Sequence, residues 1–118
     1  MREKVKKYIK ILEIEFEETI EYLEYLLEAH RFREGQGEIT HYVYLENVTV
    51  LRNELSGIKN CVETIKLLEA DNFEDLASLI MHLEKRIAEN VKHFSYPKAV
   101  LIMCQRKLEK VKKFVLES

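Results

Sequence analysis

Four polar residues between positions 82 and 93 are of types that can act on phosphate groups. His82, Arg86, Glu89 and His93 are spaced four, three and four residues apart, so they would share one face of an α-helix. Near neutral pH an imidazole can transfer protons, and a guanidinium binds anions. Most stripes of this kind are solvated helix surface with charge pairing four residues apart, which is the interpretation we adopt. Two functional alternatives use parts of the same stripe.

The first alternative rests on Arg86 and His93, which are separated by six residues near the end of a predicted helix. This spacing resembles the R-x4–6-H motif of HEPN domains over about eight residues of the chain. The resemblance implies an all-α, often dimeric and often metal-independent ribonuclease. In that family's terms, Arg86 would stabilise phosphate and transition-state charge, and His93 would exchange protons with the ribose 2′-hydroxyl.

The second alternative is phosphotransfer by His82. His82-x-x-Lys85 resembles the His-x-x-Lys core of histidine phosphotransfer domains, which are also four-helix bundles of this size. The resemblance implies that His82 accepts a phosphoryl group while Lys85 screens its charge.

Two further histidines flank a glycine-containing turn. His30 precedes and His41 follows the segment 34–38, and both fall on predicted apolar stripes, so we expect them to point inward. Together with His93 they have the nitrogen atoms that zinc prefers. The chain has no HxxxH motif and no repeated ExxH motif, so we predict no metal site and no cofactor.

Apolar residues recur every three or four positions along most of the chain, which predicts four helices at 2–33, 40–70, 72–93 and 97–117. Asp71-Asn72 is the expected N-cap of the third helix, and Pro97 the first residue of the fourth. Residues 39–45 are rich in β-formers and leave a strand open as an alternative. Gly57 indicates either a kink or a close helix contact.

The periodicity also predicts which side chains are buried. Cys61 and Cys104 fall at apolar helical positions and are expected to be buried free thiols. In the third and fourth helices the expected core residues are Phe73, Leu76, Ile80, Leu83, Ile87, either Asn90 or Val91, Leu101, Cys104, Leu108, Val111 and Val115.

Composition and charge narrow the class of protein. The 118 residues suit a single domain spanning 1–118, and one proline with three glycines favours a few long elements. A net charge of −2 gives no support to nucleic-acid or membrane attraction. The first residues contain no apolar segment, and no uncharged run approaches about 18 residues. We therefore expect a cytoplasmic protein with no membrane partner.

These elements predict an all-α, up-down-up-down four-helix bundle in which the first two helices are longer than the last two. The long pair should measure about 46 Å and the short pair about 31 Å, so the long pair should project by roughly 10–15 Å. The projecting end is apolar and aromatic, and a second copy is its simplest cover.

We therefore predict a non-enzymatic interaction or scaffold module that forms a homodimer, with the HEPN-like ribonuclease as the enzyme alternative. A different protein partner at the projecting end stays open. The predicted interface residues are Leu26, His30, Phe32, His41, Tyr42 and Tyr44.

Overall fold

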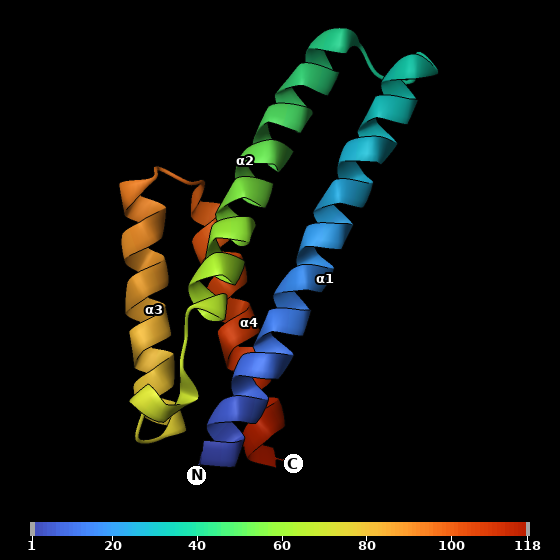
Figure 1. Cartoon of the computed structure of the whole chain (residues 1–118). Coiled ribbons are helices and arrows are strands. Elements are labelled where there is room, and N and C mark those ends of the chain that lie inside the picture. The colour runs from blue at the N-terminus through green and yellow to red at the C-terminus, as the bar shows by residue number, and fades with distance from the viewer. Residues whose placement is uncertain (1, 118) are drawn as a thin grey trace.

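The computed structural model describes residues 2–117, which form an all-α four-helix bundle (Figure 1). The helices are α1 (Arg2–Gly35), α2 (His41–Lys66), α3 (Leu76–His93) and α4 (Lys98–Glu117), and a 3-10 turn, η1 (Ala70–Asn72), lies between α2 and α3. No strand occurs within that range. The direction of the chain alternates from each helix to the next (Figure 1), as the apolar periodicity predicts.

Side-chain caps fix where α2 and α3 begin. The hydroxyl of Thr40 accepts a hydrogen bond from the backbone N–H of Val43 at 3.1 Å, so residues 41–45 are helical and the strand alternative for this segment is wrong. The N-cap of α3 is Asp75, whose carboxylate accepts from the N–H of Ser78 at 2.8 Å. The prediction of an Asp71-Asn72 cap is wrong, because those residues lie in η1. As a result, α2 ends at residue 66 instead of 70, and α3 begins at 76 instead of 72.

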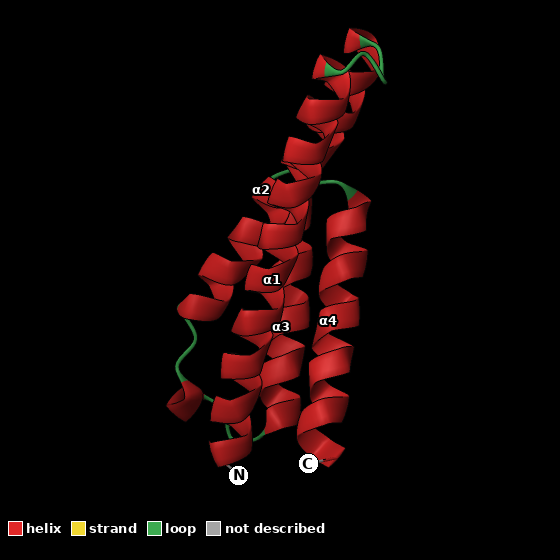
Figure 2. Cartoon of the chain, turned by 90° about the vertical axis from the view of Figure 1, so that its right-hand side faces the viewer, coloured by secondary structure: helices red, strands yellow, loops and turns green. Residues whose placement is uncertain are grey.

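The helices are unequal in length, as expected. α1 has 34 residues and α2 has 26, whereas α3 has 18 and α4 has 20. At about 1.5 Å per residue α1 alone is about 51 Å long, which nearly equals the longest dimension of the molecule, 54 Å. Figures 1 and 2 show the α1–α2 hairpin extending well past the connection between α3 and α4. We call residues 22–50 the tip. We call the part of the molecule in which all four helices pack together the base.

The core fills the base. Five residues predicted for the core or as alternatives in it are only half-buried: Phe73, Leu76, Asn90, Val91 and Leu101. Val100 is fully buried in place of its neighbour Leu101, because Val100 packs against Gly57 of α2. Leu79 of α3 is a core residue that the periodicity did not single out. The buried side chains of the last two helices are Leu79, Ile80, Leu83, Ile87, Val100, Cys104, Leu108, Val111 and Val115.

Gly57 allows α2 and α4 to approach closely. A Cβ atom on Gly57 would lie 2.6 Å from Cγ2 of Val100, well inside normal contact distance. The α-helix continues through Gly57. Of the two interpretations of this glycine, the close helix contact is therefore confirmed.

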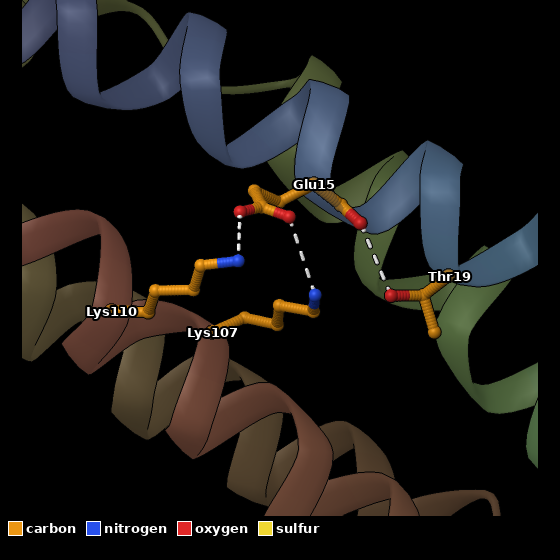
Figure 3. Close-up of polar contacts among 4 residues, drawn as sticks. All are labelled: Glu15, Thr19, Lys107 and Lys110. Atoms are coloured by element: carbon orange, nitrogen blue, oxygen red, sulfur yellow. Dashed lines mark hydrogen bonds and ion pairs between the residues drawn. The ribbon is translucent and has the colours of Figure 1, made fainter. Parts of the chain in front are cut away.

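A half-buried carboxylate joins α1 to α4 at the base (Figure 3). Glu15 lies between two lysines of α4, with its Oε1 2.6 Å from Nζ of Lys110 and its Oε2 3.3 Å from Nζ of Lys107. Its backbone carbonyl also accepts a hydrogen bond from the hydroxyl of Thr19 at 3.1 Å. Hydrogen bonds from the two lysines, led by Lys110, lower the pKa of the Glu15 carboxyl.

This ion pair predicts an effect of pH on stability. Because the pKa of Glu15 is lower in the folded chain, its contribution is fully present above the unfolded pKa of about 4.3 and is lost as pH falls through the folded value. At pH 7, Glu15→Gln should lower the free energy of unfolding by about 1 kcal/mol, since Lys110 is solvated. Urea unfolding of the native protein and of Glu15→Gln should show that their difference in free energy of unfolding is smaller at pH 3 than at pH 7. A difference that is unchanged at pH 3 would contradict the role of the carboxylate.

Candidate functional site

Three of the six predicted interface residues are half-buried: Leu26, His30 and Tyr44. The Nδ1 atom of His30 lies 2.8 Å from the carbonyl oxygen of Leu26, one helical turn earlier, and Leu26 packs on the core. Because they are half-buried in the single chain, these side chains have less free surface to offer a partner than exposed side chains have.

The other three, Phe32, His41 and Tyr42, are exposed. Phe32 is 65% exposed and Tyr42 is 70% exposed. The expectation that His41 points inward is wrong. His41 is the first residue of α2, and its Nδ1 lies 2.9 Å from Oε1 of Glu34 across the turn.

One seven-residue series on α1 runs from the base into the tip. At the base, the Tyr8 hydroxyl donates to the carbonyl of Leu108 in α4 at 3.0 Å, and burial raises the pKa of this phenol. Glu15, seven residues later, binds α4 through its two lysines. Tyr22 and Ala29 are the next members of the series and lie on the same face of α1. Tyr22 is already 60% exposed.

A matching series runs along α2. Gly57 packs against Val100, in the first turn of α4. Val50 and Val43 precede Gly57 by seven and fourteen residues and therefore lie on the same face of α2. They lie past the start of α4 and are 53% and 37% exposed.

Together these two series define an apolar surface in which three side chains are exposed and Ala29 is half-buried. We call it the open face: Tyr22 and Ala29 on α1, Val43 and Val50 on α2. It continues, into the tip, the surface that α4 covers at the base. These four residues are not among the interface residues predicted from the sequence. Counting seven-residue steps back from Gly57 would have found the two valines, but only once Gly57 was known to face α4.

A depression of about 290 Å³ between α1 and α2 presents a different chemistry. Arg31 donates to the Glu28 carboxylate at 3.2 Å, and a hydrogen bond with the Tyr44 side chain raises the pKa of the Arg31 guanidinium. Because both acidic and basic side chains line this depression, it is suited to contact with water. The depression is lined by Glu24, Leu27, Glu28, Arg31, Tyr44, Val48, Arg52 and Leu55.

The polar stripe on α3 is exposed, as expected for helix surface. Arg86 and His93 nevertheless border one open depression of about 720 Å³, together with Glu89, Asn90, Lys92 and Phe94. The His93 ring packs edge-on against Phe94, with centroids 4.7 Å apart.

His82, the remaining residue of the stripe, does not line that depression. Its ring packs against Phe73, with centroids 5.3 Å apart. Phosphotransfer by His82 stays a prediction.

Within residues 2–117, no three histidine, cysteine, aspartate or glutamate side chains come together in an arrangement that could hold a metal ion. None of the helices described for this chain combines the length and the apolar character that crossing a membrane requires. Comparisons with protein-family models, with curated proteins and with solved structures found no match.

Proposed function

We propose that this chain is a non-enzymatic helical interaction module that self-associates by docking its tip onto the tip of a second copy. The observation that carries the proposal is the open face, an apolar surface that runs on from the α4 contact and stays exposed in the single chain. Apolar side chains that are exposed on one side of a helical hairpin are typical of an interaction site.

A second copy is the partner that suits this surface best. None of the four side chains of the open face carries a charge, so these side chains themselves bring no like charges together, and the carboxylates of Glu46 and Glu54 flank Val50 one turn away on either side. Two hairpin tips packed face to face would form a four-helix bundle, with each tip taking the place that α4 has at the base. Burying about 800 Å² on each copy would make an interface of standard size.

The mass of the native protein in solution tests this proposal. Light scattering at tens of micromolar should give twice the chain mass of 14.1 kDa. A particle of one chain mass at that concentration would overturn self-association, and would leave the tip as a surface for a different protein.

The HEPN-like ribonuclease is a second candidate function, supported by one observation. Arg86 and His93 border the same depression, and both side chains are exposed. Arg86 would bind a phosphate and His93 would transfer the proton. The amide of Asn90, between them in the sequence, donates to Asn60 at 3.1 Å and to Thr64 at 3.2 Å, so this part of α3 is fixed to α2.

RNA cleavage in the presence of EDTA tests the second candidate. Activity should be lost in Arg86→Ala and in His93→Ala, and kept in Lys85→Ala, which changes an exposed cation of α3 outside the depression. Cleavage that survives either of the first two changes would remove this candidate.

A further inference from the structure

The two cysteines of the chain meet in the core. Cys61 of α2 and Cys104 of α4 are 2% and 0% exposed, and their Sγ atoms lie 2.9 Å apart. Carbon atoms that are not bonded to each other pack at about 3.5–4.0 Å, and sulfur is larger than carbon. The two sulfur atoms are therefore closer than an ordinary packing contact, with no other atom between them.

The packing of α2 against α4 explains this contact. Cys61 follows Gly57 by four residues, and Cys104 follows Val100 by four residues. α2 and α4 run in the same direction (Figure 1), so the two pairs are successive contacts along one parallel interface. Because Gly57 has no side chain, the helices approach closely enough one turn later for the thiols to meet.

We propose that Cys61 and Cys104 form an intrachain disulfide bond when the protein encounters a small neutral oxidant such as hydrogen peroxide. The thiolate of one cysteine attacks one peroxide oxygen and becomes a sulfenic acid as the O–O bond breaks. The hydroxide that leaves takes up the proton lost by the thiol and becomes the first water. The sulfur of the second cysteine then attacks the sulfenic sulfur, forming the S–S bond and releasing the second water. Two thiols and one peroxide thus give one disulfide and two waters.

The environment of the pair limits which oxidants can act and how fast. The hydrogen bond with Cys61, together with burial, raises the pKa of the Cys104 thiol, so little thiolate is present near neutral pH and oxidation is slow. Both sulfur atoms are inaccessible to a protein thiol or disulfide. These conditions favour a small uncharged peroxide over exchange with a bulky partner.

The bond would tie the long hairpin to the short pair of helices. It would close a loop between cysteines 43 positions apart, which includes all of α3. Such a cross-link lowers the entropy of the unfolded chain. For a domain of this size, we expect the oxidised protein to melt on the order of 10 °C higher than the reduced protein.

Mass spectrometry of the full-length chain tests the proposal. After peroxide treatment, unfolding in denaturant and addition of iodoacetamide, the chain should carry no alkyl group and weigh about 2 Da less than the reduced chain. Dithiothreitol should restore two alkylation sites and return the melting temperature to the reduced value. Cys104→Ala, the matched control, should keep one alkylation site and show no peroxide-dependent rise in melting temperature.

Two alkylated thiols after peroxide treatment would overturn the proposal. So would a disulfide between two chains on a non-reducing gel, or oxygen atoms added to the cysteines without loss of two hydrogens.

Discussion

Replacing both Tyr22 and Val50 with lysine is expected to convert the proposed dimer into monomers of 14.1 kDa. Both side chains belong to the open face, so the change would place up to four added charges between two copies, where apolar side chains would otherwise meet. We expect the dissociation constant to rise roughly 100-fold or more. Light scattering across a concentration series measures the change.

Folding of the single chain should be little affected by this double substitution. Both positions are exposed in the single chain, so the free energy of unfolding should change by about 0.5 kcal/mol or less. Lysine suits position 50 because Glu46 and Glu54 lie one turn away on either side. Circular dichroism should therefore show unchanged helix content.

The control replaces two exposed apolar residues at the base, Met81 and Phe114, with lysine. They are as exposed as the tip pair but lie on α3 and α4, away from the open face. This variant should stay dimeric. A tip variant that remains a dimer, or a base variant that dissociates equally, would show that the open face is not the contact.

The second large effect compares two phenylalanines of α1. Phe16→Ala should lower the free energy of unfolding by about 3–5 kcal/mol, because Phe16 is fully buried in the base. Phe32→Ala makes the same chemical change on the same helix. It should lower the free energy of unfolding of the monomer by no more than about 0.5 kcal/mol. Urea unfolding of each variant, monitored by circular dichroism at concentrations where the protein is monomeric, gives both values.

A loss at Phe32 comparable to that at Phe16 would mean that the tip contributes to the folding of the single chain. The tip would then be an extension of the core and not a surface left open for a partner.

The sequence predicts the fold well because helical periodicity is a local property. Steps of three and four along the chain indicate all four helices and their unequal lengths. The predicted boundary between α2 and α3 is wrong for a physical reason. Asp71, Asn72 and Asp75 are all good capping residues, and only the tertiary structure shows that Asp75 accepts from Ser78 while the other two lie in η1.

The candidate site was less predictable. The sequence indicated that the tip is apolar, but periodicity within one helix does not say which apolar face lacks a neighbour. Leu26 and Tyr44 are therefore predicted to be interface residues although both are half-buried in the single chain. Val43 and Val50 are not predicted from the sequence because their exposure depends on how much of α2 is covered by α4. The contact between Gly57 and Val100 places the first turn of α4 beside Gly57, so both valines lie past the start of α4.

The contact between the cysteines illustrates the same limit. The sequence indicates that Cys61 and Cys104 are each apolar and buried. Their meeting depends on the parallel packing of α2 and α4 and on the missing side chain of Gly57, which no local pattern encodes.

The distance between two copies at the tip tests tip-to-tip docking most directly. A nitroxide label at Gln36→Cys would lie in the exposed turn at the end of the tip and leave the open face unchanged. The native cysteines are buried and out of reach of the reagent. A label at Met81→Cys on α3 serves as the control.

Pulsed dipolar spectroscopy should give an intermolecular distance of about 20–40 Å for the label at position 36, because two tips would pack at the spacing of helices in a bundle. The label at position 81 should give a much longer distance or no dipolar signal. Tip labels without dipolar coupling in a protein of twice the chain mass, or a shorter distance at position 81 than at position 36, would contradict tip-to-tip docking.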